Sequence, residues 1–329
     1  MYKDFPYKLL NSDELIRQFN DYCVEQLRFL FIIDYKAKSG YLIPESELDE
    51  NFIKCSFCEK EQKQDPSIVS EWQPEPLQFE EYKIKFDKVV AHIHFGNSFL
   101  VNLTQPTYVK TNLTIKDLYN TGTAKYKLWL KDKFTVLSPE IFVRIQNGEI
   151  SSYPMKGTIN ANISDAAEKI LNDPKEKAEH ATIVDLIRND LSMVAENVIV
   201  KRYRYIDELV TNNGNLLQVS SEIEGKLPPG YNNKLGDLLF SMLPAGSISG
   251  APKPKTLQII EETEGYYRGF YTGVFGWCDG ENLDSAVMIR FAEPAPNGLM
   301  FKSGGGITSQ SDAKSEYEEL IQKIYVPFR

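Results

Sequence analysis

Residues 141–152 have the sequence Ile-Phe-Val-Arg-Ile-Gln-Asn-Gly-Glu-Ile-Ser-Ser, in which an Asn-Gly pair separates two short, alternating apolar runs. Asn147-Gly148 favours a tight turn because both residue types tolerate positive φ, so this stretch predicts a β-hairpin. Asp279-Gly280 and Asn297-Gly298 lie between similar runs. Repeated hairpins indicate antiparallel sheet. Because strands and helices do not alternate regularly, we expect an α+β fold rather than a doubly wound parallel sheet.

Helical patterns separate these strand patterns. One helix is expected from about Asp173-Pro174 to about Ala195, because Asp is a good N-cap and Pro suits the first helical position. A second is expected after Pro252, and a third from about Asp312.

The N-terminal part is less regular. Ser12 is expected to cap a helix that reaches about Leu27, and the apolar run Phe29 to Ile33 predicts a strand. Residues 36–80 are polar, with weak periodicity, and we expect mostly loop there. No break in composition follows residue 82. We therefore expect one catalytic domain, 1–329, with a variable N-terminal part (1–81) and a catalytic core (82–329).

The composition of the chain argues against several classes of protein. Hydrophobic residues make up 42% and charged residues 25% of the 329 residues, as in ordinary globular proteins. No stretch is long and apolar enough for a membrane span, and the N-terminus lacks the apolar core of a signal peptide, so a cytoplasmic location is expected. The net charge of −9 disfavours nucleic-acid binding. Cys55 and Cys58 form half of a zinc motif that Cys23 and a histidine would have to complete, so we expect ordinary thiols.

Two glycine-rich segments, Gly246–Lys253 and Gly304–Gly306, match neither a Walker loop nor a dinucleotide-binding fingerprint. They could simply be tight turns. Alternatively, the glycines let backbone N–H groups approach an anion, with the helix expected at Pro252 adding its positive end. The spacing leaves both alternatives open.

Charged side chains supply further candidates. Glu316 and Glu319 are three residues apart and share a helix face, either as acids of the first turn or as ligands of a divalent cation together with Glu179. Lys156 is either a surface loop residue or, if buried, a nucleophile or base whose pKa burial would lower. His92 and His94 are expected to face the same side of a strand, but two ligands do not make a metal site.

Taken together, these segments resemble the chorismate-utilising enzymes, a family that includes aminodeoxychorismate synthase component I, anthranilate synthase component I and the isochorismate and salicylate synthases. The matching segments span about 60% of the chain in one order: Ser138–Phe142, Pro154–Thr158, Ala178–His180, Val184–Leu191, Pro244–Lys253, Arg268–Gly273, Ile289-Arg290, Gly304–Gly306 and Glu316–Glu319. The resemblance implies two large antiparallel β-sheets packed as a sandwich, with helices outside and chorismate in a cleft.

The resemblance also implies roles for individual residues. Glu179 and Glu319 match the acids that hold Mg²⁺ against the ring carboxylate of chorismate, and Glu316 supports the ion through water. The positions that match substrate contacts are Gly157, Thr158, Ser247, Lys253, Tyr271, Arg290, Gly304, Gly305 and Gly306.

Within the family, Pro-x-Lys-Gly-Thr resembles aminodeoxychorismate synthase, since anthranilate synthases typically carry alanine at the lysine position. The resemblance implies that Lys156 attacks C2 of chorismate while Glu140 protonates the C4 hydroxyl as it leaves. Ammonia then attacks C4, giving 4-amino-4-deoxychorismate for para-aminobenzoate and folate synthesis, which we class as a transaminase-type reaction. Isochorismate and salicylate synthases carry a basic lysine where this chain has Leu100, which cannot activate water.

Gln218 stands where related enzymes usually have histidine, and a glutamine cannot transfer protons at neutral pH. This disfavours anthranilate formation, which must also expel pyruvate. No glutaminase signature is present, so ammonia is expected from solution or from a separate glutamine amidotransferase subunit. The regulatory tryptophan site of larger relatives is not recognisable. The alternatives are anthranilate synthase component I and a non-catalytic chorismate-binding subunit.

Overall fold

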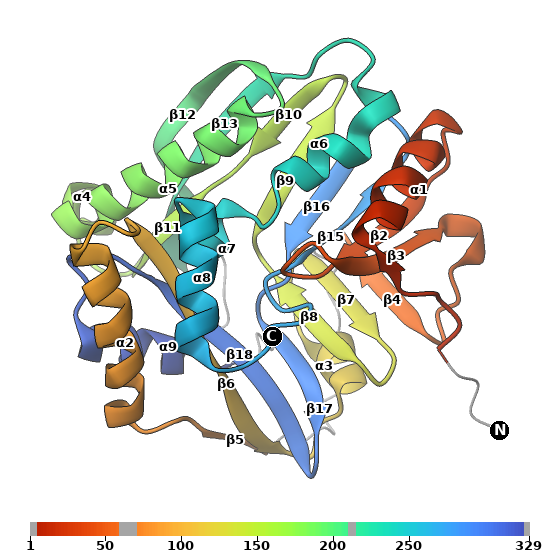
Figure 1. Cartoon of the computed structure of the whole chain (residues 1–329). Coiled ribbons are helices and arrows are strands. Elements are labelled where there is room, and N and C mark those ends of the chain that lie inside the picture. The colour runs from red at the N-terminus through yellow and green to blue at the C-terminus, as the bar shows by residue number, and fades with distance from the viewer. Residues whose placement is uncertain (1–4, 59–70, 210–214, 326–329) are drawn as a thin grey trace.

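A computed structural model describes residues 5–58, 71–209 and 215–325. It contains two antiparallel sheets packed face to face, with helices on their outer faces (Figure 1). The expected α+β sandwich is therefore confirmed. Among these residues, no helix is long and apolar enough to cross a lipid bilayer.

The first sheet has ten strands, and all of its pairings are antiparallel. In spatial order they are β1 (Leu10–Asn11), β3 (Ser39–Pro44), β2 (Phe29–Ile33), β15 (Val274–Cys278), β16 (Leu283–Val287), β9 (Ile141–Gln146), β10 (Glu149–Ser152), β13 (Leu216–Lys226) and β11 (Met155–Asn160), with β12 (Glu196–Leu209) also paired to β13. The hairpins expected at Asn147-Gly148 and Asp279-Gly280 are the β9–β10 and β15–β16 turns.

The second sheet has eight strands, again antiparallel. Their order is β14 (Gly250–Ala251), β6 (Leu100–Thr111), β18 (Gly298–Ile307), β17 (Phe291–Ala295), β8 (Phe134–Ser138), β7 (Tyr126–Leu130) and β4 (Ile53–Ser56), with β5 (Trp72–Glu75) paired to β6. A hairpin joins β17 to β18, as the sequence predicts, but its two turn residues are Pro296 and Asn297, and Gly298 is the first residue of β18.

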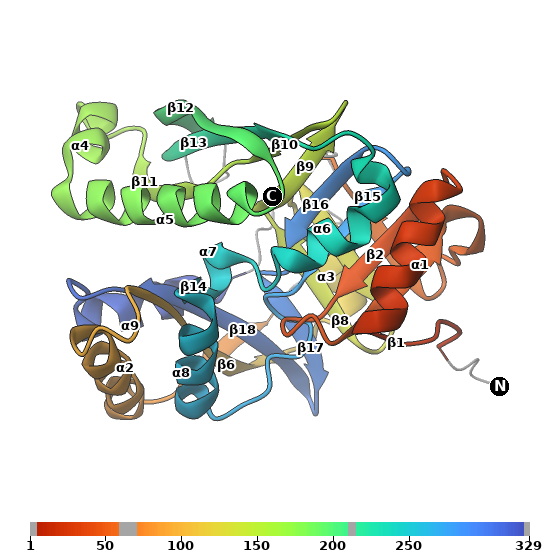
Figure 2. The ribbon, with the colours of Figure 1, turned by 45° about the horizontal axis from the view of Figure 1, so that its top comes forward.

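The helices cover the outer faces of both sheets. They are α1 (Ser12–Val24), α2 (Phe79–His94), α3 (Ile115–Thr121), α4 (Ala166–Asn172), α5 (Pro174–Ser192), α6 (Leu235–Ser241), α7 (Gly246–Ser249), α8 (Lys253–Glu264) and α9 (Ala313–Gln322), with 3₁₀ turns at Glu45–Glu47 and Tyr231–Lys234. Figure 2 shows the short helix α7 between α5 and the layer that holds β6 and β18. This junction positions the site described below.

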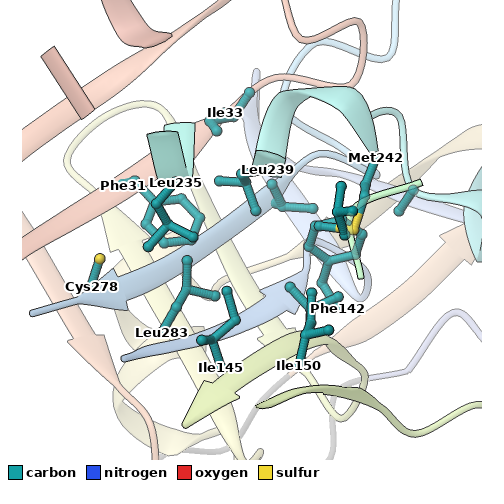
Figure 3. Packing of buried hydrophobic residues seen from close by; sticks show 14 of the residues in the cluster. Phe31, Ile33, Phe142, Ile145, Ile150, Leu235, Leu239, Met242, Cys278 and Leu283 are labelled. Carbon is teal, nitrogen blue, oxygen red and sulfur yellow. The ribbon is translucent and has the colours of Figure 1, made fainter. Parts of the chain in front are cut away.

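Strand β2 shows how the layers are held together. Phe29, Phe31 and Ile33 pack with the helices on the outer face, whereas Leu30 and Ile32 pack between the two sheets. Both faces are buried because helices cover the outer face of β2 and the second sheet covers its inner face. Burying each such side chain contributes about 1.5–3 kcal/mol relative to leaving it exposed. Figure 3 shows the outer cluster, in which side chains of strands β2, β9, β10, β15 and β16 meet those of α6 and of the residue that follows it.

The expected helices of the core are present. Asp173 caps α5 by accepting a hydrogen bond from the Glu176 amide, and Pro174 occupies the first turn. Helix α8 follows Pro252, and Asp312 caps α9. The N-terminal helix differs from expectation. Its N-cap is Asn11, in a capping box with Glu14, because the Asn11 side chain reaches the Glu14 amide, and the helix ends at Val24 rather than near Leu27.

Two further expectations are wrong. Residues 36–80 are not mostly loop, since strands β3, β4 and β5 lie there; residues 59–70 are outside the described ranges. Strands β4 and β5 are short and pair with distant segments, so their local pattern is weak, whereas β3 forms a hairpin with β2. His92 and His94 lie in α2 rather than on a strand, and residues two apart do not face each other on a helix.

The cysteines form no zinc site in the described residues. Cys23 and Cys278 are both buried, and their Sγ atoms are 3.7 Å apart. Cys23 therefore lies beside Cys278 and does not complete a metal site with Cys55. Cys58 is exposed. All four thiols are free.

Candidate functional site

A cavity of about 250 Å³ is lined by residues of strands β6 and β18, of helix α5 and of the short helix α7. Nine of the predicted site residues line it: Glu140, Lys156, Glu179, Ser247, Tyr271, Arg290, Gly304, Gly305 and Gly306. They come from segments far apart in the chain, so the fold assembles a site that the motifs only outlined. Gly157, Thr158, Lys253, Glu316 and Glu319 are not part of its lining.

Glu140, which directly precedes β9, is held by one strong contact. The Ser247 hydroxyl donates a hydrogen bond to Glu140 Oε1 at 2.7 Å. Burial raises the pKa of Glu140 above its ordinary value, while the hydrogen bond from Ser247 and the charge of Lys323 partly oppose that rise. A carboxyl group with a raised pKa keeps its proton longer and can act as a general acid.

Lys156, on β11, lies in the cavity as an ammonium group paired with an acid. Its Nζ is 2.8 Å from Glu179 Oε2. Burial opposes the charge on Lys156, but the adjacent Glu179 carboxylate outweighs burial, so the pKa of Lys156 is raised above its ordinary value. The expectation that burial would lower this pKa is therefore wrong for this arrangement, because the sequence did not place Glu179 beside the lysine.

Three acids converge next to the cavity, and each is close to a lysine. Glu179 pairs with Lys156, and Lys323 Nζ is 2.7 Å from Glu319 Oε1. Lys175 Nζ lies 3.7 Å from Glu179 Oε1 and 3.7 Å from Glu316 Oε1. With the lysines in these positions, no three Asp, Glu, His or Cys side chains within the described ranges are arranged to hold a metal ion.

The donor set nevertheless suits Mg²⁺, which prefers carboxylate oxygens and retains waters. Glu179 Oε1 is a buried oxygen without a hydrogen-bond partner, so it has capacity for a further ligand. Burial raises the pKa of Glu316, whereas for Glu319 the charges of Lys323 and Lys156 outweigh burial and lower the pKa. The acids therefore supply the donor type that a divalent cation prefers, and Glu179 Oε1 is open to it.

The glycines of β18 connect these acids with the cavity. A Cβ atom on Gly305 would face the acid cluster, 3.5 Å from Glu316 Oε2 and 3.7 Å from Glu319 Oε1. On Gly304 it would lie 2.5 Å from the Leu103 carbonyl oxygen of the neighbouring strand. Because both residues are glycines, strand β18 can lie close to β6, and the surface of β18 stays open to a ligand.

Arg290 and Tyr271 form another part of the wall. Arg290 directly precedes β17 with φ of 49°, and burial lowers the pKa of its guanidinium, although the group stays charged at neutral pH. A planar guanidinium can bind two oxygens of a carboxylate at once. Burial raises the pKa of the Tyr271 hydroxyl, so it is a neutral hydrogen-bonding group.

Some predicted substrate contacts lie elsewhere. The Lys253 ammonium is 2.7 Å from Asp190 Oδ1 and donates to the Met242 carbonyl, so it fixes the segment before α8 rather than facing the cavity. Gly157 has φ of +84°, and a Cβ atom there would lie 2.7 Å from Glu176 Oε2. Thr158 is exposed. Lys253, Gly157 and Thr158 are therefore not among the residues that line the cavity.

Gly246 allows two helices to pack closely. A Cβ atom at this position would lie 1.8 Å from a Leu186 methyl carbon, and the Gly246 amide donates to Asp190 Oδ2 at 3.2 Å. The glycine lets α7 approach α5 closely. Of the two alternatives for this segment, anion contact remains open for Ser247, whose side chain lies at the cavity.

Sequence reasoning missed two lysines that line the cavity, Lys302 and Lys323. Lys323 Nζ also donates to the Gly304 carbonyl oxygen at 2.9 Å. Its position four residues after Glu319 on the last helical pattern was an available signal. Lys302 is buried and pairs with Glu293 at 2.9 Å, which no local pattern indicates. Leu100 lines the cavity too, whereas Gln218 is not among the lining residues and lies opposite Thr158 in the sheet.

Comparisons with known proteins identify the family of this chain. A family model described as chorismate binding enzyme matches residues 14–329. An uncharacterized PabA-like protein of Haemophilus influenzae is 46% identical over 317 residues, covering 95% of this chain and 96% of that protein. Aminodeoxychorismate synthase component 1 of Escherichia coli is 30% identical over 315 residues, covering 89% of this chain and 66% of that protein.

The fold has solved counterparts. The menaquinone-specific isochorismate synthase MenF of Escherichia coli superimposes with a TM-score of 0.72, covering 96% of this chain and 82% of that chain at 17% identity. That likeness shows the fold alone. Neither of the two relatives by sequence is named a transaminase, so the transaminase class expected for the reaction has no support. The match over nearly the whole chain, together with the cavity, shows that this protein belongs to the family of chorismate binding enzymes.

Proposed function

We propose that this chain is an aminodeoxychorismate synthase component 1, which converts chorismate and ammonia into 4-amino-4-deoxychorismate. The observation that carries the proposal is that Lys156 and Glu140 line one cavity, the first as a potential nucleophile and the second as a buried acid. The Escherichia coli relative with that name supports it.

The reaction divides one difficult displacement into two steps. Neutral Lys156 Nζ bonds to C2 of chorismate, the ring double bonds shift, and the C4–oxygen bond breaks. Glu140 gives its proton to the departing hydroxyl, which leaves as water. Ammonia then bonds to C4, the double bonds shift back, and the C2–nitrogen electron pair returns to Lys156. Glu140 regains its proton from the new C4 ammonium group.

Binding of the substrate dianion would use the positive wall of the cavity. We propose that Arg290 and Tyr271 hold a carboxylate of the substrate and that Ser247 holds the Glu140 carboxyl group in place through its hydrogen bond. Mg²⁺ held by Glu179 and Glu319, with Glu316 acting through water, would neutralise the ring carboxylate. Lys156 must separate from Glu179 and lose its proton before it can attack, because an ammonium group has no free electron pair.

The ammonia source is part of the proposal. The Escherichia coli relative is named component 1 of its synthase, which implies a second component there. We propose that a separate glutamine amidotransferase subunit supplies ammonia here, and that free ammonium can replace it in an assay.

Anthranilate synthase component 1 is the second candidate function. It would require pyruvate to leave, but Gln218, which stands where related enzymes usually have histidine, does not line the cavity and so does not decide between the two reactions. Lys156, in contrast, stands where those enzymes typically carry alanine. A non-catalytic chorismate-binding subunit is disfavoured because Glu140, Lys156 and Glu179 all meet at the cavity.

One assay separates these functions. The purified chain is incubated with chorismate, Mg²⁺ and ammonium, and the product is identified by chromatography and mass. Formation of 4-amino-4-deoxychorismate is expected. Anthranilate with pyruvate, or isochorismate, would overturn the proposal, and absence of turnover would favour the non-catalytic subunit.

A further inference from the structure

Lys175, in the first turn of α5, has no role in the reaction described above. Its Nζ lies between two acids from different helices, 3.7 Å from Glu179 Oε1 on α5 and 3.7 Å from Glu316 Oε1 on α9. Neither distance is short enough for a hydrogen bond. The ammonium group therefore occupies the space between the two carboxylates without being tightly held by either.

Helix stability does not explain this lysine. Positive charge near a helix N-terminus is unfavourable because that end of the helix dipole is itself positive. A lysine four residues before a glutamate is also the weaker orientation of that helical pair. Lys175 is thus placed against the local preference of α5, and the favourable contact that it gains from another element is with Glu316 on α9.

The position also explains the electrostatics of the cluster. Burial opposes the charge on Lys175, but Glu179 and then Glu316 outweigh it and raise the pKa of the lysine. Glu179 Oε1, one of the two oxygens that lie 3.7 Å from Lys175, is buried and has no hydrogen-bond partner among the described residues. A small cation that coordinated this oxygen directly would satisfy it better than a lysine 3.7 Å away.

We propose that Lys175 is an internal competitor for the divalent cation. Its ammonium group balances Glu179 and Glu316 in the metal-free chain and turns out to solvent when the cation binds. Its side chain is 42% exposed, so it can reach solvent without disturbing the core. The inference rests on the proposed function in one respect, the assignment of Glu179, Glu316 and Glu319 to the cation. A built-in competitor weakens cation binding and removes repulsion between the acids when no cation is present.

The test is titration of the substrate-free chain with Mg²⁺ by calorimetry. Lys175→Met should bind Mg²⁺ about two- to fivefold more tightly than the unaltered chain, the range expected when a partly exposed ion pair is removed. Lys177→Met is the matched control, because Lys177 is exposed on the same helix and the substitution removes the same charge. Lys175→Arg keeps a competing cation and should bind Mg²⁺ like the unaltered chain.

Equal Mg²⁺ affinity for Lys175→Met and Lys177→Met would overturn the proposal, since only a general charge effect would remain. Glu179→Gln locates the ion: loss of Mg²⁺ binding in this variant is expected. Binding that survives Glu179→Gln would place the cation elsewhere and would overturn both the competitor and the proposed metal ligands. The product assay is independent of these titrations, so the proposed reaction stands or fails separately.

Discussion

Ser247 Oγ donates a hydrogen bond to Glu140 Oε1 at 2.7 Å and so connects the short helix α7 with the start of β9, 107 residues away in the chain. Both residues line the cavity. A donated hydrogen bond favours the ionised carboxylate, so this contact moderates the effect of burial on the proposed acid.

Removing the hydroxyl with Ser247→Ala should therefore raise the pKa of Glu140 further. Because Glu140 must be protonated to act as an acid, activity is lost as the pH rises through its pKa. The alkaline limb of the kcat profile should move to higher pH. Ser249→Ala is the control, since the Ser249 hydroxyl donates to the Ala245 carbonyl oxygen instead. An unchanged limb in Ser247→Ala would show that this hydrogen bond does not tune the acid.

Lys156→Ala should lose most turnover yet still bind chorismate, because the lysine is proposed to act as nucleophile. Product formation measures the first effect and calorimetry with chorismate the second. In the unaltered chain without ammonium, intact-protein mass spectrometry should detect an adduct of chorismate minus water. A near-normal rate in Lys156→Ala would show that Lys156 is not the nucleophile.

Local signals predicted much of this fold. Asn147-Gly148 forms the two-residue turn of one hairpin, Asp279-Gly280 begins the loop of another, and Asp173 and Asp312 cap helices within one turn. Strands β4 and β5 were missed because β4 pairs with β7 and β5 with β6, so their stability comes from residues far along the chain. His92 was misplaced because its neighbours alternate in polarity although they belong to a helix.

Only the part of the site that belongs to sequence motifs could be predicted. They identified the residue types, and the fold brought Glu140, Lys156 and Glu179 to one cavity. Spacing could not show that Lys253 is neutralised by Asp190, or that Glu179 faces Lys156. Such pairings depend on how α5 packs against its neighbours, which no single segment encodes.

The cavity wall also depends on a buried ion pair. Arg268 Nη2 is 2.6 Å from Glu264 Oε1, both side chains are buried, and Arg268 donates to the carbonyl oxygens of Asn102 and Ile248, which line the cavity. Glu264→Ala leaves a buried guanidinium without its carboxylate. It should cost about 3–5 kcal/mol of unfolding free energy.

Chemical denaturation measures this cost. Glu262→Ala, at an exposed position of the same helix, is the control and should stay close to the unaltered chain. A loss below about 1 kcal/mol in Glu264→Ala would mean that water or another group replaces the carboxylate.

Leu100→Lys tests the choice of nucleophile. Leu100 lines the cavity on β6, where isochorismate and salicylate synthases carry a basic lysine. A lysine here could activate water, so the variant should release some isochorismate in addition to any amino product. Chromatography separates the two. Leu100→Met keeps the volume without a base and should form none; isochorismate from Leu100→Met would show that residue 100 does not control entry of water.

His180 couples stability to pH. It is fully buried, Nε2 lies 2.7 Å from the Ser221 hydroxyl, and burial followed by the charge of Arg204 lowers its pKa to about 4. The unfolded chain takes up a proton near pH 6.5, but the folded chain does so only near pH 4. Stability should therefore fall as the pH drops through this window and level off below it, by on the order of 3 kcal/mol from this group.

Replacing the imidazole with His180→Asn removes the titrating group, whatever it does to absolute stability. The slope of unfolding free energy between about pH 6.5 and 4 should then be flatter than in His94→Asn, which removes an exposed histidine and keeps the buried one. Carboxylates that titrate in the same range are common to both variants, so the difference isolates His180. Parallel slopes would mean that His180 takes up its proton at the same pH in the folded and unfolded chains.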